Sequence, residues 1–238
     1  MSQNNPMIQE MKERVYKGNL QLPKWGLVTL TWGNVSEINR ELGVIVIKPS
    51  GVDYEVMTAD DMVVTDLDGH KLDEQSLNPS SDLPTHVELY KAFNEIQSVV
   101  HTHSNNAVSW AQSGIDLPVY GTTHADTFYG PVPNTRQLTQ AEVEAAYEVN
   151  TGKVIVETFS QRQIDENAIP GVLVNGHGPF TWGPSLAKAI ENSLVLDQVC
   201  LMARNTELTV KDNVLPQYIL DKHYYRKHGE NAYYGQKK

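Results

Sequence analysis

The sequence predicts an α+β or layered α/β/α fold with a mixed or antiparallel central sheet. Short β-branched runs are bracketed by stretches of helical periodicity, but they lack the strict strand–helix alternation that a parallel sheet requires. The 238 residues contain no linker-like segment, internal repeat or shift in composition. We therefore expect residues 1–238 to form a single domain.

The first part of the chain is predicted to contain one helix and three strands. Apolar residues at helical spacing predict a helix over 8–15, and Gly18 is a typical residue for ending it. Alternation with threonine predicts a strand over 27–32. β-Branched residues predict further strands over 44–47 and 62–64, each followed by a turn.

The middle of the chain alternates between helical and extended patterns. Apolar residues three apart predict a helix over 85–94, and the apolar run that follows predicts a strand over 98–103. Ser104 can cap a helix that runs to Gln112. A Thr-x-x-Glu capping box opens another helix over 139–152, which a glycine is expected to close.

The last part of the chain is predicted to add two strands and two helices. Runs of β-branched residues predict strands over 154–156 and 172–174. A long amphipathic helix is expected over 186–194, directly after a proline. A final helix over 216–227 is expected to stop at Gly229.

The composition is that of an ordinary globular protein, with 40% hydrophobic and 20% charged residues. A net charge of -10 argues against general nucleic-acid binding, although a local patch for a small anion is compatible with it. No apolar run approaches the roughly 20 residues of a membrane span, and the first residues lack a signal-peptide pattern. The single cysteine, Cys200, excludes an intrachain disulfide and is expected in the core. These features predict a cytoplasmic protein without a membrane partner.

The most informative motif is His101-Thr102-His103 at the end of a predicted strand. Residues i and i+2 of a strand point to one side, so both imidazoles could bind one metal ion, although two surface histidines would give the same pattern. His177, in a glycine-rich turn after another strand, is a third candidate ligand. Three histidines with an open position are typical of a catalytic site. Asp82 is a possible fourth ligand, with helix capping as an equal alternative.

Two turns of small residues are predicted to bind phosphate. One offers a lysine, a serine and glycine-exposed amides, and the other precedes a helix start, where the dipole attracts anions. An asparagine at a strand end adds a further donor. Each turn alone is more often a plain turn, but together they suit a small phosphorylated substrate. The predicted phosphate-binding residues are Gly33, Asn34, Lys48, Ser50, Gly51, Ser80 and Ser81.

These motifs occur in the order found in class II aldolases of sugar phosphates, and the chain resembles that family over nearly its full length. The motifs are Thr31-Trp32-Gly33-Asn34-Val35-Ser36, Ile47-Lys48-Pro49-Ser50-Gly51, Pro79-Ser80-Ser81-Asp82, His101-Thr102-His103 and Gly176-His177-Gly178. Two further segments resemble the epimerase branch of the family: Gly121-Thr122-Thr123-His124-Ala125-Asp126 and Tyr233-Tyr234-Gly235-Gln236. The aldolase branch carries glutamate at Asp82. The shorter carboxylate should reach a substrate carbon less well, which favours the epimerase branch.

The resemblance implies a layered α/β/α domain with a mainly antiparallel sheet, assembled as a homotetramer with sites between subunits. It implies Zn²⁺ on His101, His103 and His177, with Asp82 on or near the metal, and Mn²⁺ or Co²⁺ as substitutes. The implied activity is the interconversion of two phosphorylated ketopentoses, L-ribulose 5-phosphate and D-xylulose 5-phosphate, at C4 in L-arabinose catabolism.

The implied mechanism is retro-aldol cleavage followed by aldol addition. The metal polarises the C2 carbonyl, a base takes the C4 hydroxyl proton, and the C3–C4 bond breaks to give dihydroxyacetone enediolate and glycolaldehyde phosphate. The aldehyde then rotates, so each of its faces needs an acid/base group. By resemblance these groups are Asp126 and Tyr234, the latter from a neighbouring subunit. Thr122, Glu148 and His223 are weaker candidates.

Two other functions stay open from the sequence. A class II aldolase that releases the free aldehyde would use the same metal and phosphate sites. A zinc-stabilised interaction protein is disfavoured by the open coordination position and the convergent phosphate turns. His70, His86 and His228 are expected to carry no chemistry.

Overall fold

The computed structural model describes residues 5–210 and 212–236, and its centre is a six-stranded sheet in which every strand pair is antiparallel. The strand order is β3-β2-β1-β4-β6-β5. The strands are β1 Asn34–Asn39, β2 Val44–Ile47, β3 Val63–Asp66, β4 Ser98–His101, β5 Gly171–Val174 and β6 Gly178–Gly183. The predicted layered α/β fold with an antiparallel sheet is confirmed.

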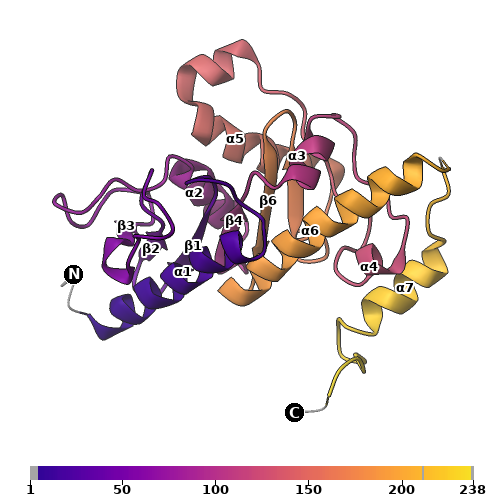
Figure 1. Ribbon diagram of the computed structural model, residues 1–238, viewed down its shortest axis with the longest axis horizontal. Coiled ribbons are helices and arrows are strands. Elements are labelled where there is room, and N and C mark those ends of the chain that lie inside the picture. The colour runs from indigo at the N-terminus through magenta and orange to yellow at the C-terminus, as the bar shows by residue number, and fades with distance from the viewer. Residues whose placement is uncertain (1–4, 211, 237–238) are drawn as a thin grey trace.

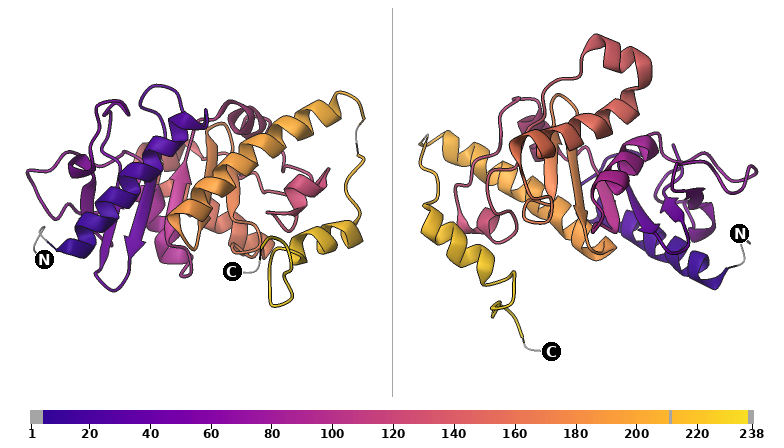
Figure 2. Two further views of the ribbon diagram at one scale, coloured as in Figure 1. Left: turned by 60° about the horizontal axis from the view of Figure 1, so that its bottom comes forward. Right: turned by 180° about the vertical axis from the view of Figure 1, so that it is seen from behind.

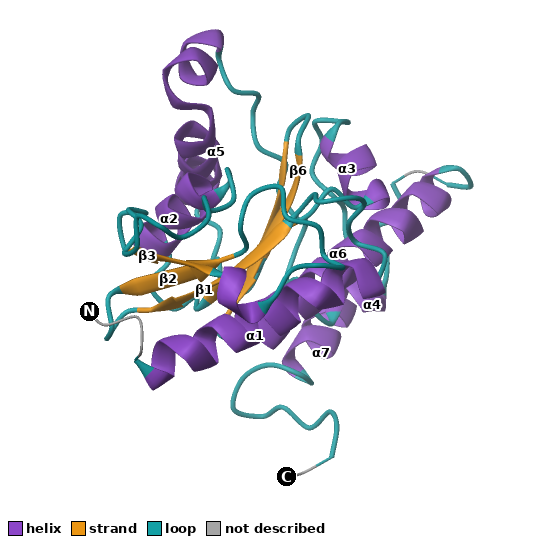
Figure 3. Ribbon diagram, turned by 60° about the vertical axis from the view of Figure 1, so that its left-hand side comes forward, coloured by secondary structure: helices purple, strands orange, loops and turns teal. Residues whose placement is uncertain are grey.

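Two pairs of long helices cover the two faces of this sheet (Figures 1 and 3). One face carries α1 (Pro6–Lys24) and α6 (Leu186–Glu207), and the other carries α2 (Leu83–Ala92) and α5 (Gln140–Arg162). The shorter helices are η1 Ala59–Asp61, α3 Asn105–Ala111, α4 Thr122–Ala125 and α7 Gln217–Tyr225. In the part of the chain that the structure describes, no helix is both long and apolar enough to cross a membrane.

The alternation of side chains along β2 explains the two-sided packing. Val44 and Val46 belong to the apolar cluster under α1, whereas Ile45 and Ile47 belong to the cluster that includes α2 and α5. All four are fully buried, and each buried aliphatic side chain contributes roughly 1.5–3 kcal/mol to stability. Cys200 of α6 is also buried, as predicted.

Two predicted strands are wrong. Residues 27–32 form turns before β1, and Leu30 takes a positive φ of 53°, which a strand does not allow. Residues 154–156 lie inside α5, where Ile155 and Phe159 are one helical turn apart and pack into the same core cluster. Helical packing against α2 therefore outweighs the β-propensity of the valines and isoleucine. Strands β1 and β6 were not predicted.

Two glycines that were expected to end helices instead lie within them. α1 continues past Gly18 to Lys24, and α5 continues past Gly152 to Arg162. A Cβ atom on Gly18 would lie 2.6 Å from the Leu186 side chain of α6, and one on Gly152 would lie 2.6 Å from Cβ of Glu88 in α2. These glycines permit close approach of two helices, a role that sequence cannot distinguish from helix termination.

The C-terminal part of the chain forms a small separate layer together with α4. Helices α4 and α7 lie against each other beside the end of α6, and the C-terminal tail extends from α7 (Figures 1 and 2). Leu220 of α7 packs on Ala125 of α4, and the Tyr129 hydroxyl donates to Asp221 at 2.6 Å. This layer therefore has its own apolar contact and its own polar contact.

Candidate active site

The candidate site lies at one end of the central strands β1, β4 and β6. Asn34 at the start of β1 pairs with His101 at the end of β4, which pairs in turn with Phe180 of β6. Antiparallel neighbours place the start of one strand beside the end of the next. Gly33 precedes β1 with a φ of 75°, and a Cβ atom there would lie 2.9 Å from the carbonyl oxygen of His101. Only glycine lets this turn approach β4 so closely.

Three histidine side chains converge at this end of the central strands. His101 is fully buried, His103 follows just beyond the end of β4, and His177 lies in the turn between β5 and β6. One ring nitrogen of each lies within 4.8 Å of the others, and the Nε2 atoms of His101 and His103 are 3.0 Å apart. The structure therefore brings together the three predicted histidine ligands.

The protonation of these histidines suits a metal ion. Nδ1 of His101 lies 2.9 Å from the carbonyl oxygen of Pro179, which only accepts, so Nδ1 carries the proton and Nε2 keeps its lone pair. Burial lowers the pKa of His103, and burial together with the charge of His101 lowers the pKa of His177 to about 3. Neutral imidazoles are the form that binds zinc and its first-row neighbours, so the donor set fits such an ion.

Asp82 faces the histidines from the start of α2. It occupies the N-cap position but makes no side-chain capping bond; instead, its Oδ2 accepts a hydrogen bond from Nδ2 of Asn34 at 2.7 Å. Burial alone would raise the pKa of Asp82, but His101, His86 and the bond from Asn34 more than offset this and hold the pKa below its usual value. An ionised carboxylate therefore stands beside the imidazoles.

A polar hollow of about 390 Å³ beside the histidines contains both predicted phosphate turns. Backbone bonds join the turns: the N–H of Ser50 donates to the carbonyl of Asn78, and the N–H of Ser80 donates to that of Lys48, each at 2.9 Å. This pairing places Ser50 and Ser81 in one hollow. All seven predicted phosphate-binding residues line it, together with Asp82, His103 and His177.

Lys48 has a different position from the one its motif suggests. Its side chain is only 1% exposed, and Nζ lies 2.9, 3.3 and 3.4 Å from the carbonyl oxygens of Val52, Pro49 and Thr31. The Tyr54 ring covers the ammonium at 4.8 Å, and burial lowers the pKa of Lys48. With a carbonyl near each of its three N–H groups, the ammonium connects the Lys48–Gly51 turn to the turn at Thr31. The geometry does not support direct contact with phosphate.

The sequence reasoning missed Tyr147, which a break in α5 places at the hollow. Ala146 has extended backbone angles inside the helix, and Oγ1 of Thr85 donates to the carbonyl of Glu148 at 2.7 Å just after the break. Tyr147 and Glu148 both line the hollow, and the Tyr147 hydroxyl lies 3.4 Å from Nδ1 of His177. No glycine or proline marks the break, so helical periodicity alone could not reveal it.

Asp126 lies in a second cluster of polar side chains, between α4 and α7. Its carboxylate accepts hydrogen bonds from Arg226 at 2.8 Å, lies 3.0 Å from Nδ1 of His223 and forms an ion pair with Lys227 at 3.1 Å. Burial alone would raise the pKa of Asp126, but hydrogen bonds from Arg226, His223 and Lys227 outweigh it and hold the pKa below its usual value. The backbone N–H of Asp126 donates to the carbonyl of Thr122 at 2.9 Å.

Tyr234 belongs to the same cluster of the same chain. The Arg226 guanidinium lies 4.9 Å from the centre of its ring, and the Lys227 ammonium lies 4.5 Å from it. Asp126 and Tyr234 thus share two cationic neighbours. Neither of them, nor His223 or Thr122, lines the histidine hollow. Within one chain, the predicted acid/base residues are together but separate from the predicted metal ligands.

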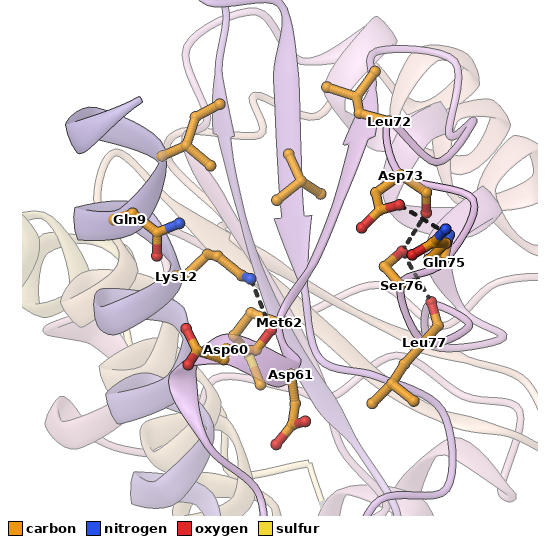
Figure 4. Close-up of a pocket in the computed structure, with 12 residues that line it drawn as sticks. Gln9, Lys12, Asp60, Asp61, Met62, Leu72, Asp73, Gln75, Ser76 and Leu77 are labelled. Carbon is orange, nitrogen blue, oxygen red and sulfur yellow. Dashed lines mark hydrogen bonds between the residues drawn. The ribbon is translucent and has the colours of Figure 1, made fainter. Parts of the chain in front are cut away.

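A hollow of similar size, about 370 Å³, lies between α1, η1 and the loop after β3 (Figure 4). Nζ of Lys12 donates to the carbonyl of Asp60 there at 2.7 Å, and Asp61 is bonded to Thr58. Apolar side chains such as Leu77 form much of the remaining wall, and the described lining includes no histidine. This hollow therefore lacks the donor set that distinguishes the site on β4.

An antiparallel sheet with three histidines and a carboxylate at the ends of its central strands is typical of α/β enzymes with a metal-binding site. The family model for the class II aldolase and adducin N-terminal domain matches residues 13–203, and the chain belongs to this class II aldolase family. Curated relatives include the L-ribulose-5-phosphate 4-epimerases UlaF of Salmonella paratyphi C (strain RKS4594) and Salmonella choleraesuis (strain SC-B67). Each is 49% identical over 231 residues, which cover 97% of this chain and 100% of the relative.

Solved structures support the fold. An L-fuculose 1-phosphate aldolase superposes with a TM-score of 0.74 at 22% identity, covering 90% of this chain and 94% of that chain. The L-fuculose 1-phosphate aldolase of Glaciozyma antarctica PI12 also gives a TM-score of 0.74, at 17% identity, covering 94% of this chain and 84% of its own. At this level of identity, the likeness concerns the fold alone.

Proposed function

We propose that the protein is a metal-dependent epimerase that interconverts L-ribulose 5-phosphate and D-xylulose 5-phosphate by inverting C4. The observation that carries the proposal is the 49% identity, over nearly the whole chain, with proteins named L-ribulose-5-phosphate 4-epimerase. The histidine triad, the paired turns and the Asp126 cluster supply the groups that a retro-aldol and aldol sequence needs.

We assign one divalent ion to His101, His103 and His177, with Asp82 beside it. Zn²⁺ is the first choice because three imidazoles with an open position suit it, and Mn²⁺ or Co²⁺ are expected to substitute. A bound ion would polarise the C2 carbonyl of the ketose as a Lewis acid. The hydrogen bond from Asn34 keeps the Asp82 carboxylate turned toward the imidazoles.

The paired turns are proposed to hold the substrate phosphate. Hydroxyl groups of Ser50 and Ser81 and backbone N–H groups at Gly51 line the hollow next to the histidines. Holding the phosphate at one end and the carbonyl at the other fixes the C3–C4 bond between them, which lowers the entropic part of the barrier. Lys48 contributes by fixing its own turn against the turn at Thr31.

The acid/base groups are proposed to come from a neighbouring subunit of a homotetramer. Asp126 and Tyr234 share their cationic neighbours in one chain and do not line that chain's own hollow. We therefore place both residues of one subunit over the histidine pocket of the next. The Asp126 carboxylate takes the C4 hydroxyl proton on one face of the aldehyde, and the Tyr234 hydroxyl donates to the alkoxide that forms on the other.

A class II aldolase that releases glycolaldehyde phosphate is the second candidate, since the structural neighbours include aldolases. The epimerase is preferred because the curated relatives carry that name and because Asp82 is shorter than the glutamate of the aldolase branch. Cytoplasmic L-arabinose catabolism is part of the same proposal and rests on this substrate assignment.

The direct test is to supply the purified, metal-loaded enzyme with L-ribulose 5-phosphate. We expect D-xylulose 5-phosphate to accumulate to equilibrium with at most traces of glycolaldehyde phosphate. Stoichiometric release of glycolaldehyde phosphate would identify an aldolase instead. Neither product, with the metal demonstrably bound, would reject the substrate class.

A further inference from the structure

A row of buried polar side chains runs from the histidine pocket into the core. Asp82, His86 and Tyr90 are four residues apart, so they share the face of α2 that lies against β1. Asn34 and Ser36 are two apart on β1, so they share the face that meets α2. Asn34 bonds to Asp82, and Ser36 bonds to both His86 and Tyr90. We call these five residues the polar row.

Hydrogen bonds assign the protons along this row. The Tyr90 hydroxyl bonds to Oγ of Ser36, 2.7 Å away, and a hydroxyl proton buried at this depth needs an acceptor, so we assign the Tyr90 proton to that bond. The single proton of Ser36 then goes to Nδ1 of His86, also at 2.7 Å. Nδ1 is therefore the acceptor nitrogen of His86, and Nε2 carries its proton.

That Nε2–H group has no hydrogen-bond partner, although His86 is completely buried. Only four buried side-chain atoms of the described residues lack a partner, and two of them, Nε2 of His86 and Oδ1 of Asn34, belong to the polar row. Buried donors in native proteins are nearly always paired, so an unpaired one next to a candidate active site indicates a role there.

The neighbours of His86 connect it with the histidine pocket. Its ring meets Phe180 edge-on with centroids 6.0 Å apart, and Phe180 stacks on His101 at 4.1 Å. Asp82, one helical turn before His86, is the carboxylate whose charge acts on the ring. Asn34 already occupies Oδ2 of Asp82, which leaves Oδ1 for a further donor.

We propose that His86 is a positioning residue whose Nε2–H group serves the Asp82 carboxylate through one buried water and holds it toward the histidine triad. The inference deepens the proposed function and rests on it. Tyr90 and Ser36 fix the tautomer, and His86 passes that constraint to Asp82. No motif in the sequence assigns chemistry to His86, because a histidine in an apolar helix is usually only a core residue.

Two substitutions of His86 separate its nitrogens. In His86→Gln the amide nitrogen takes the place of Nε2, whereas in His86→Asn it takes the place of Nδ1. We expect His86→Asn to weaken Zn²⁺ binding about 10–100-fold, as loss of an outer partner of metal ligands does. His86→Gln should recover most of that affinity. Zn²⁺ affinity is measured by competition with a chelating dye on the full-length enzyme.

His124→Asn and His124→Gln provide the matched control, since His124 is also buried, and burial lowers its pKa to about 4. Its Nε2 bonds to the carbonyl of Gly130, away from the metal pocket, so neither variant should change Zn²⁺ affinity. Equal affinities of His86→Asn and His86→Gln, or the reverse ranking, would overturn the inference.

The tautomer of His86 in the wild-type enzyme gives a second readout that needs no variant. Nitrogen-15 NMR should find the proton on Nε2, and a proton on Nδ1 would overturn the inference even if the variants fail to fold. The proposed function fails separately: undiminished Zn²⁺ binding in a His103→Asn variant would reject the metal site itself. Normal wild-type binding with an unaffected His86→Asn variant would reject only the role of His86.

Discussion

The histidine pocket and the Asp126 cluster differ in their burial and in their charge. The pocket lies at strand ends in the middle of the sheet, His101 is fully buried, and burial lowers the pKa of His103 and of His177. The Asp126 cluster stands on a four-residue helix, the last helix and the tail; it is highly charged, and Tyr234 is 62% exposed. The proposed metal ligands thus lie at the ends of core strands. The groups that we propose to exchange protons lie in the layer of α4, α7 and the tail, which we propose that a second subunit covers.

The largest expected effect is the loss of a metal ligand from the pocket. His103→Asn should abolish stoichiometric metal binding and lower epimerase activity about 10³-fold or more, since Lewis-acid stabilisation is worth several kcal/mol. Elemental analysis and the coupled epimerase assay measure the two losses. His70→Asn is the control, because His70 is exposed and pairs only with Asp66. Full metal occupancy in His103→Asn would contradict the assignment.

The next effect should separate the two regions. Asp126→Asn and Tyr234→Phe should each reduce epimerase turnover about 10²–10⁴-fold, the usual contribution of a positioned acid or base. Metal content should stay at the wild-type level in both, because neither residue lines the histidine hollow. Tyr218→Phe, which alters an exposed tyrosine of α7 outside this cluster, should keep full turnover. Metal loss in Asp126→Asn would mean that the two regions are not independent.

Mixing inactive variants tests how the regions meet. Asp126→Asn mixed with Tyr234→Phe should recover no activity, because both residues belong to one cluster of one chain. His103→Asn mixed with the Asp126→Asn, Tyr234→Phe double variant should recover about one quarter of the wild-type activity after subunit exchange, since interfaces with two intact halves then form at random. Recovery in the first mixture would show that Asp126 and Tyr234 act from different subunits.

A smaller effect is expected at the phosphate turns. Ser81→Ala should raise KM for L-ribulose 5-phosphate about tenfold to a hundredfold, as a hydrogen bond to a charged group contributes about 1.5–3 kcal/mol. Turnover should also fall, because the phosphate positions the reacting carbon. Ser160→Ala, on an exposed part of α5, is the control. Unchanged steady-state kinetics would remove Ser81 from the site.

The last prediction concerns the stability of the fold at low pH and has no direct effect on turnover. Burial lowers the pKa of His86 and of His177 to about 3, whereas both titrate near 6.5 in the unfolded chain. Between these values the unfolded chain binds more protons, so the free energy of unfolding falls as pH drops below 6.5. In enzyme from which a chelator has removed the metal, the free energy of unfolding should change by up to about 1.4 kcal/mol per pH unit for each histidine. Urea unfolding at several pH values measures it, and His177→Asn should reduce it. A flat profile from pH 7 to 5 would contradict the buried neutral state.

The sequence predicted which side chains come together better than it predicted the elements that carry them. Short motifs located the histidines and the phosphate turns because their residue types are demanded by the ligand, whatever the surrounding structure. The misplaced elements depended on packing that sequence does not show. Gly152 is read equally well as a helix stop or as a contact with α2, and the bend at Ala146 has no local signal. The separation of Asp126 from the pocket is likewise a property of the folded chain.

The buried ammonium of Lys48 has a consequence for how this site can change over time. It joins the Lys48–Gly51 turn to the turn at Thr31 through the carbonyl oxygens of Thr31, Pro49 and Val52, and every amino acid supplies a carbonyl. The side chains of the turns can therefore be exchanged without releasing the connection between them. Mutation or laboratory selection can therefore alter substrate preference through the side chains of the turns, while the backbone shape of the turns stays the same.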